Sequence, residues 1–358
     1  FANTIVAKKY NEQASNKRIL ALTASPGYSK EKIREICQNL FIENVEMKME
    51  QDEDVTPYIQ EKEVEFVTVN LPQEIKDMHN LLKQSYREKV NNLKKFGLTK
   101  PSSIVNKRDI ISLQKRLQAT TRSSKSFASF WGISLTAQAL KLSHAMELLE
   151  TQSIKSLQKF LEKLNDDNSK AAKLILKEDN IKKTIDLLKV LVEKSFVNQK
   201  IQKLLEIINE ELKNNPNKKI IVFANYRDTV DELVEHLKTI ENAKPIKLVG
   251  HKEGFSQKDQ VSTVKKFSEG IYNILIGTSI MEEGLDIISC DLAVFYDMVP
   301  SEIRTIQRRG RVGRVRPGKI IMLIAKGTRD EAFRWTAHRK EKAMRNVIKN
   351  IKDEQEEQ

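Results

Sequence analysis

Cysteine, aromatic residues and long apolar runs are all scarce in this sequence. Two cysteines in 358 residues are too few for a disulfide framework, and they favour a reducing compartment such as the cytoplasm. One of them, Cys290, lies in the apolar stretch 287–296, where we expect a buried structural thiol. The five histidines are scattered without the spacing of metal ligands. These features argue against a disulfide-stapled scaffold and against a metal site built by this chain.

The sequence also lacks an apolar run of the roughly 20 residues that a membrane-spanning helix needs. Its first residue, Phe1, is not a methionine, which suggests a piece of a longer protein. A length of 358 residues, of which 39% are hydrophobic, suits two or three packed domains.

Basic residues outnumber acidic ones, and the excess is unevenly placed. The net charge is +13, and residues 74–200 alone hold 25 basic and 13 acidic side chains. Residues 1–73 carry 9 basic and 12 acidic side chains, whereas residues 201–358 carry 28 and 24. One strongly basic segment is the electrostatic footprint of a polyanion partner. A lysine-rich bias on solvated helix faces is the competing interpretation of the same counts.

Hydrophobic periodicity divides the chain into three parts, residues 1–72, 73–200 and 201–358. The first part has α/β texture, with predicted strands at 18–23 and 64–71 and a helix that Ser29 caps. The second part shows helical periodicity alone, at 74–96, 107–129, 135–164 and 181–213. The third part alternates helices with short apolar strands, at 219–224, 245–249, 271–277, 291–296 and 319–325. We therefore predict an α/β fold with parallel sheets and an all-α insert.

Residues 307–314, with the sequence QRRGRVGR, carry the strongest chemical signal. Four arginines and two glycines in eight residues suit a ligand rather than a packed helix face. Guanidinium groups bind phosphate through bidentate hydrogen bonds and a permanent charge. A solvated basic loop is the plainer alternative, but the spacing after a predicted strand favours a phosphate site.

Residues 276–287, with the sequence IGTSIMEEGLDI, carry the second signal. A buried strand ends at Gly277, and hydroxyl side chains follow at the carboxyl edge, where open α/β sheets bind ligands. A tight acidic loop comes next. Ordinary surface charge remains an alternative for Glu282, whereas Gly284 and Asp286 together point to a nucleotide.

These segments resemble superfamily-2 helicases. Residues 23–25 (TAS) look like motif III, 222–227 (VFANYR) like motif IV, 278–287 like motif V and 307–314 like motif VI. A helical insert between the motor domains, and the stretch ALKLSHAMELLET at 139–151, narrow the resemblance to the Hef/FANCM family. The resemblance covers essentially the whole chain. It implies that residues 1–72 are the last part of a first RecA-like motor domain, that residues 73–200 are a thumb-like insert that grips branched or duplex DNA, and that residues 201–358 are a second RecA-like motor domain. In that family, ATP hydrolysis drives translocation and the remodelling of fork-shaped DNA.

The resemblance assigns nucleotide roles to five residues. Arg311 and Arg314 correspond to arginine fingers on the γ-phosphate, and Gln307 orients their loop. Gly284 and Asp286 approach the ribose and phosphates of the nucleotide. Within the same motif, the neighbouring Arg308 is a candidate structural residue.

The resemblance assigns contacts and coupling to five more residues. Thr278, Asn225 and Arg227 correspond to contacts with the nucleic-acid backbone. Thr23 and Ser25 correspond to residues that couple the two motor domains.

Two motifs of the family are missing from the sequence. It contains neither G-x-x-x-x-G-K-[ST] nor a DEAH-type box, which cradle the triphosphate and hold Mg²⁺. The family places both before motif III, so we expect ATP and Mg²⁺ to be bound mainly by a preceding motor segment. We also expect the nuclease domain of Hef to be missing, and this chain alone to be inactive.

Two other functions remain open at this stage. An RIG-I-like ATPase stimulated by double-stranded RNA shares the insert and much of the motif set. A non-catalytic nucleic-acid-binding module fits the missing phosphate loop.

Within the insert, basic residues gather early. Residues 74–150 hold 14 basic and 6 acidic side chains, and we predict phosphate contacts from Lys107, Arg108, Lys115 and Arg116. The aromatic residues Phe127, Phe130 and Trp131 follow them. Stacking on nucleobases is the alternative role for these three rings, but we predict that they lie in the core, because the helix needs an apolar face.

Overall fold

The computed structural model describes residues 2–48, 52–58, 60–102, 104–123, 127–194, 196–250, 256–282, 285–313 and 317–356. It forms two compact units. The sheet unit comprises residues 1–67, 207–324 and 330–358, and the helical unit comprises residues 68–206 and 325–329. Residues 1–67 therefore share a unit with the segment that carries motifs IV to VI. A parallel sheet and a separate helical region confirm the predicted α/β class.

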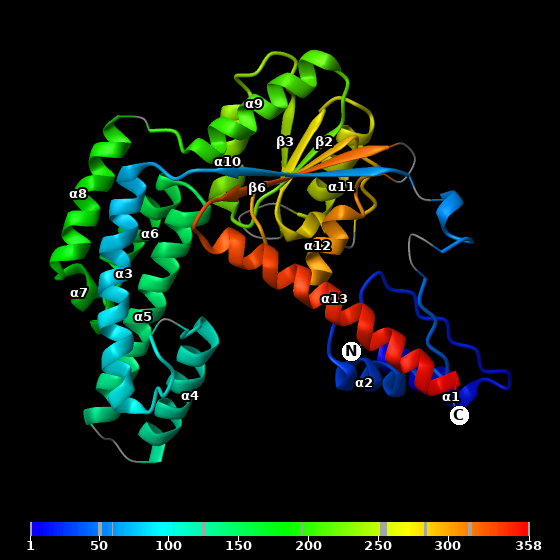
Figure 1. Cartoon of the computed structure of the whole chain (residues 1–358), viewed down its shortest axis with the longest axis horizontal. Coiled ribbons are helices and arrows are strands. Elements are labelled where there is room, and N and C mark those ends of the chain that lie inside the picture. The colour runs from blue at the N-terminus through cyan, green and yellow to red at the C-terminus, as the bar shows by residue number, and fades with distance from the viewer. Residues whose placement is uncertain are drawn as a thin grey trace. The chain divides into compact units, whose positions relative to one another are not determined.

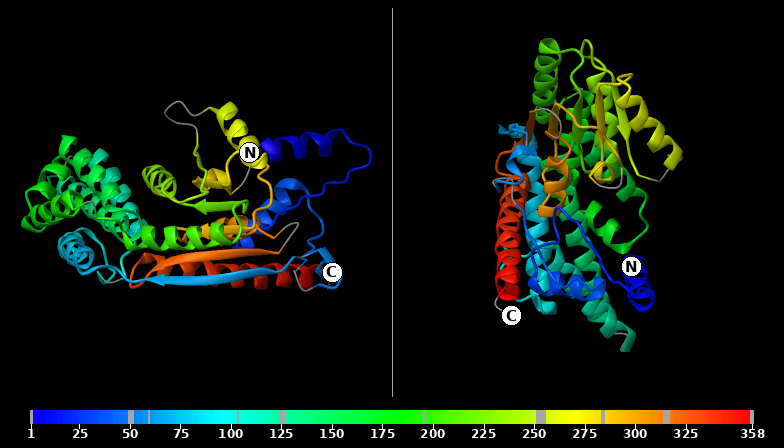
Figure 2. Two further views of the ribbon diagram at one scale, coloured as in Figure 1. Left: turned by 90° about the horizontal axis from the view of Figure 1, so that it is seen from above. Right: turned by 90° about the vertical axis from the view of Figure 1, so that its right-hand side faces the viewer.

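The sheet unit is built on six strands in the order β1-β6-β5-β2-β4-β3. The strands are β1 (Lys62–Val69), β2 (Ile220–Phe223), β3 (Pro245–Leu248), β4 (Ile274–Gly277), β5 (Leu292–Phe295) and β6 (Gly318–Ala325). β2 pairs in parallel with β4 and β5, β3 with β4, and β5 with β6. β1 lies alongside β6 at the edge of the sheet (Figure 2). The predicted strand at 64–71 and the five strands predicted within residues 201–358 are confirmed, and β1 and β3 form the two edges of the sheet.

The strands of this sheet are short apolar runs. Helices cover both faces of the sheet, so side chains on both sides of each central strand are buried. Every residue of β2, β4 and β5 is buried, which is the pattern of a parallel sheet between helical layers. Their side chains join one core with Phe267, Met281 and Cys290, so the predicted buried thiol is confirmed.

Helices cover this sheet and extend beyond it. They are α1 (Ala2–Gln13), α2 (Lys30–Leu40), α9 (Gln199–Asn214), α10 (Arg227–Leu237), α11 (Gln257–Ser268), α12 (Glu302–Arg309) and α13 (Arg329–Glu356). The predicted cap of α2 is confirmed, since the Ser29 side chain accepts a hydrogen bond from the Lys32 amide. Ile33 of α2 packs against Met344 and Ile348 of α13.

The predicted strand at 18–23 is wrong. These residues form no strand, and Leu20 and Leu22 are 82% and 85% exposed. An apolar run becomes a strand only where a neighbour supplies hydrogen bonds and packing. No strand of the described chain pairs with this segment.

The helical unit contains α3 (Gln73–Leu93), α4 (Lys107–Ser123), α5 (Phe127–Thr151), α6 (Ile154–Asp166), α7 (Lys170–Leu176) and α8 (Asp179–Glu193). Figure 1 shows α3, α5, α6 and α8 running side by side, and α4 packs on the lower part of α5. One core joins α3, α5, α6, α7 and α8, and a second joins α3, α4 and α5. The predicted helices at 135–164 and 181–213 were too long, because each spans a break between two helices. The predicted helix at 107–129 covers α4 and the start of α5, and residues 124–126 of that prediction lie outside the described residues.

The predicted burial of the aromatic residues on α5 is also wrong. Phe127, Phe130 and Trp131 are 78%, 53% and 43% exposed. The adjacent Gly132 faces the core instead, and a Cβ added there would lie 2.8 Å from Leu117 and 2.9 Å from Phe96. The first turns of α5 therefore pack on α4 through their small residues and leave the large rings outside.

Candidate functional site

The candidate site lies at the carboxyl ends of β2, β4 and β5. Because these strands are parallel, the residues that follow them meet at one edge of the sheet. Asn225 follows β2, the turn 278–282 follows β4, and Asp297 follows β5. The helix α12 begins just beyond, where the side chain of Ser301 accepts a hydrogen bond from the Arg304 amide at 3.4 Å. The fold thus brings motifs IV, V and VI together.

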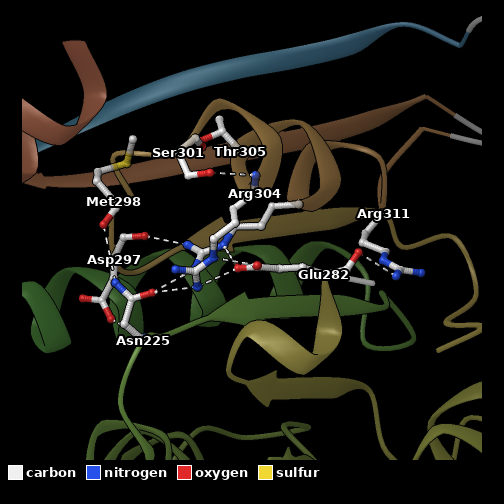
Figure 3. Close-up of polar contacts among 9 residues, drawn as sticks. Asn225, Glu282, Asp297, Met298, Ser301, Arg304, Thr305 and Arg311 are labelled. Atoms are coloured by element: carbon white, nitrogen blue, oxygen red, sulfur yellow. Dashed lines mark hydrogen bonds and ion pairs between the residues drawn. The ribbon is translucent and has the colours of Figure 1, made fainter. Parts of the chain in front are cut away.

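Glu282 is the acidic centre of this edge. Its buried carboxylate accepts from Arg304 Nε at 2.7 Å and Nη2 at 2.9 Å, and from Arg308 Nε at 2.8 Å (Figure 3). Charge-assisted bonds of this bidentate kind are the strong ones in proteins. They tie the turn after β4 to α12. The surface-charge interpretation of Glu282 is therefore wrong.

Arg308 connects the remaining two strand ends. Its fully buried guanidinium donates from Nη1 to the Asp297 carbonyl at 2.7 Å and from Nη2 to Asn225 Oδ1 at 3.0 Å. The same group lies over the rings of Phe223 and Phe295, at 5.2 and 5.6 Å. Burial lowers the pKa of Arg308, and the charge of Glu282 opposes that shift. A guanidinium remains charged in this setting, so Arg308 acts as a buried structural cation.

Arg311, two residues after the end of α12, contacts the loop of motif V and not the ends of β2 and β5. Its buried guanidinium donates from Nη1 to the Leu285 carbonyl at 3.0 Å and from Nη2 to the Glu282 carbonyl at 2.8 Å. Arg311 thus holds the two ends of the acidic loop of motif V. Asp286 follows that loop and is exposed, whereas Gly284 lies outside the described residues.

The other predicted nucleotide contacts occupy the same segment. Gln307 is half-buried near the end of α12. Arg314 lies outside the described residues. Arg309, at the variable position of the motif, pairs with Glu341 of α13 instead of facing the edge.

The predicted nucleic-acid contacts Thr278 and Arg227 lie at this edge too. Thr278 is half-buried, and its amide donates to the Leu248 carbonyl at 3.3 Å. Arg227 begins α10 and donates from Nη2 to the Gly250 carbonyl at 2.6 Å. Gly277, which precedes Thr278, packs so closely on β3 that a larger residue would not fit: a Cβ at this position would lie 2.1 Å from the Leu248 carbonyl oxygen.

Asn225, the third predicted contact, is engaged inside the protein. Its backbone amide donates to Asp297 Oδ2 at 2.6 Å, and its Oδ1 accepts from Arg304 and Arg308. The Asn225 side chain therefore positions the arginine network.

The motif III residues contact α13. The Ser25 hydroxyl is buried 3.0 Å from the Met344 sulfur, and the Ser25 amide donates to Thr23 Oγ1 at 3.1 Å. Thr23 itself is exposed.

The four predicted phosphate contacts of the helical unit divide into two pairs. Lys107 is bound to Glu147 at 2.9 Å, and Arg116 donates to the Gly97 carbonyl at 3.4 Å. Arg108 and Lys115 are exposed, and in the described chain they have no such partner. They lie seven residues apart, which places them on one face of α4.

Sequence reasoning missed Arg304 and Asp297. The signal for Arg304 was its spacing of four from Arg308 on a helix, which places both guanidinium groups on one face. The role of Asp297 had no sequence signal, because its carbonyl and its carboxylate act through the sheet geometry. Within the described chain, no group of three histidine, cysteine or carboxylate side chains forms a metal site. The described helices include none that is long and apolar enough to cross a membrane.

Two protein families match this chain. The "Helicase conserved C-terminal domain" family matches residues 199–316, and a helical-bundle family of ATP-dependent RNA helicases matches residues 74–195. The chain is 38% identical, over 98% of its length, to a protein of Methanocaldococcus jannaschii named as ATP-dependent RNA helicase MJ1505. It is 33% identical, over 94% of its length, to the ATP-dependent DNA helicase fml1 of Schizosaccharomyces pombe. The chain spans only 44% and 42% of these two relatives.

A solved structure agrees with these matches. The Hef helicase domain of Pyrococcus furiosus shares 39% of its sequence with this chain, with a TM-score of 0.74. The match covers 94% of this chain and 71% of that domain. The chain belongs to the Hef/FANCM family of superfamily-2 helicases.

Proposed function

We propose that this chain supplies the second motor segment and the DNA-gripping insert of an ATP-driven motor acting on branched DNA in the cytoplasm. The observation that carries the proposal is the hydrogen-bond network of Arg304 and Arg308 with Glu282 and Asn225. It links three motifs of a helicase at one edge of a parallel sheet. The charges at its centre, Glu282 and Arg308, are buried, and buried charges are costly unless they are paired and hydrogen-bonded, so the network favours one arrangement of the edge.

The network also positions the residues that follow α12. Arg308 anchors α12, and the segment after it is held beside β5, where the Cys290 amide donates to the Arg311 carbonyl at 3.2 Å. Arg311 then holds the loop that leads to Asp286. We assign Arg311 and Arg314 to the γ-phosphate of ATP, where arginines stabilise the charge that develops in phosphoryl transfer.

The chain does not by itself present a complete nucleotide site. The phosphate loop and the acidic box are absent from its sequence, and among the described residues no group of three or more His, Cys, Asp or Glu side chains could hold a metal ion. The described residues therefore form no Mg²⁺ site on their own. The magnesium and most of the triphosphate belong to a segment with those motifs.

The test is DNA-stimulated ATP hydrolysis by a full-length protein. Arg311→Ala and Arg314→Ala should each lower turnover on the order of 10³-fold while DNA affinity is retained. Arg309→Ala is the matched control from the same segment, because Arg309 pairs with Glu341. Near-normal hydrolysis in the Arg311 and Arg314 variants would overturn the assignment, and measurable turnover by this chain alone would contradict the need for a preceding segment.

A second candidate substrate is duplex RNA. One matched family and two relatives, one from Methanocaldococcus jannaschii and one from Arabidopsis thaliana, carry RNA helicase in their names. A competition between fork DNA and duplex RNA for the same protein distinguishes the two, and preferential binding of fork DNA is expected.

A further inference from the structure

The helical unit leaves an aromatic face uncovered at the start of α5. Phe127, Phe130 and Trp131 are 78%, 53% and 43% exposed. Their spacing of three and four residues places them on one side of the helix. The opposite side packs on α4 through Gly132. We call these three rings the aromatic face.

Exposed aromatic rings are concentrated at this place. Among the described residues of the helical unit, Tyr86, Phe96, Phe160 and Phe196 are at least partly buried. Exposed apolar side chains elsewhere in the unit are aliphatic, such as Ile104 and Val190. A face made of rings alone offers flat π surfaces, which match nucleobases better than they match the mixed side chains of a protein partner.

Positive charge adjoins the aromatic face. The Lys170 ammonium of α7 lies 5.8 Å from the centroid of the Phe127 ring. Within the described part of the chain, no carboxylate pairs with Lys170. The nearby Asp167 is neutralised by Lys141 at 2.7 Å. A ring with a neighbouring cation suits a base and its phosphate together.

We propose that the aromatic face stacks on unpaired nucleobases of single-stranded DNA while Lys170 contacts the adjoining phosphate. The proposal deepens the proposed function and rests on it, because a branched substrate presents unpaired bases beside the duplex. Stacking is indifferent to base identity, so the site should bind any single strand.

The chain allows a direct optical test. It has two tryptophans, Trp131 and Trp335, so in a Trp335→Phe background Trp131 is the one source of tryptophan emission. Titration with an oligothymidine strand should quench this emission to saturation, because a stacked base lies against the indole. Quenching absent at saturating single strand would overturn the proposal.

A set of variants separates stacking from general binding. Changing Phe127, Phe130 and Trp131 together to leucine keeps an apolar face but removes the rings. Affinity for oligothymidine should fall about tenfold or more, whereas affinity for blunt duplex DNA should not change. Trp131→Phe should retain most of the affinity, and Val190→Ala is the matched control for an exposed apolar position. Lys170→Ala should cause a smaller loss that disappears at high salt.

The outcomes distinguish this inference from the proposed function. If the triple leucine variant binds single strands with wild-type affinity and still binds fork DNA, the stacking role of the aromatic face is wrong, but the proposed function stands. An equal loss of duplex affinity, or binding of the wild type to uncharged lipid vesicles through these rings, also overturns the stacking role. Failure of the unaltered chain to bind any DNA would instead overturn the proposed function. Unchanged thermal unfolding of the variants confirms that each comparison concerns folded protein.

Discussion

Arginine does opposite work in the two units of this protein. In α12, Arg308 is fully buried and donates to the Glu282 carboxylate and the Asp297 carbonyl of the same unit. On α4, Arg108 and Lys115 face solvent. Both segments are dense in positive charge, so local charge density alone does not separate a structural cation from a ligand-binding one.

The difference arises from what surrounds each segment. The carboxyl edge of the sheet supplies Glu282, Asn225 and the Asp297 carbonyl, so a guanidinium placed there exchanges water for hydrogen bonds. Among the described residues, no such acceptor bonds to Arg108 or Lys115 on the outer face of α4. A cation on that face stays hydrated and unpaired with a carboxylate, so its electrostatic field can attract the phosphates of a polyanion.

The largest effect is expected when the buried cation, Arg308, is removed. Arg308→Ala leaves Glu282 buried with only Arg304 as its partner, and it leaves Asn225 Oδ1 and the Asp297 carbonyl without the Arg308 donor. Loss of one partner from a buried ion pair costs about 3–5 kcal/mol of folding free energy. Urea unfolding of the variant measures this loss.

Arg309→Ala is the control for that experiment. Arg309 lies one residue away and is partly exposed in its pair with Glu341, so it should cost about 1 kcal/mol or less. Equal unfolding midpoints for the two variants would refute the structural role of Arg308.

A second change tests the close approach that positions Thr278. Gly277→Ala would place a methyl group against the Leu248 carbonyl at 2.1 Å. Overpacking against backbone costs about 1–3 kcal/mol, and it should also separate β3 from β4. Gly250→Ala is the control, because its added Cβ would lie at an ordinary van der Waals distance, 3.6 Å, from Arg227. Thermal unfolding compares them, and equal stability of Gly277→Ala and the wild type would contradict the packing argument.

The sequence predicted most of the sheet unit, because its strands carry strong and repeated patterns. Fully apolar runs followed by turns predicted β2, β4 and β5 within one or three residues of their bounds. The strand at 18–23 had the same apolar pattern and failed, because strand formation depends on a pairing partner. The breaks between α5 and α6 and between α8 and α9 were missed, because helical periodicity continues across short turns.

The candidate site was predicted less completely than the sheet. The motif residues were identified by their sequence pattern, but that pattern does not show whether a side chain points into the protein or toward solvent. Burial of Glu282 and exposure of Trp131 each depend on which neighbour packs on one side of a helix or turn. Long-range partners such as Asn225 and Arg308 meet only because the strands between them are adjacent.

A third change tests whether the exposed cations of α4 bind DNA. Arg108→Ala with Lys115→Ala should weaken fork DNA binding and flatten its salt dependence by about 0.9 units of log affinity per log salt for each phosphate that is no longer neutralised. Lys107→Ala with Arg116→Ala removes equal charge, but from residues held by Glu147 and Gly97. Binding titrations at several salt concentrations should show the larger change of slope for the first pair. Identical slopes in wild type and the first variant would show that this face of α4 is only solvated.

The smallest effect concerns an exposed ion pair of the helical unit, the counterpart of the buried pair at Glu282. The hydrogen bond from Lys141, assisted by the Ser169 amide and side chain, lowers the pKa of Asp167 from 3.8 to about 2. Since the folded state binds the proton more weakly than the unfolded state, the stabilisation is present above about pH 4 and is lost as the pH falls through about 2. Lys141→Ala should raise the Asp167 pKa toward 3.8 but not fully, because the Ser169 hydrogen bonds remain. An NMR titration of the Asp167 carboxyl carbon measures both values. Both side chains of the pair remain partly exposed, at 30% and 31%, so the variant should unfold at nearly the wild-type temperature at pH 7. A pKa that does not respond to the removal of the Lys141 ammonium would assign the shift to Ser169 alone.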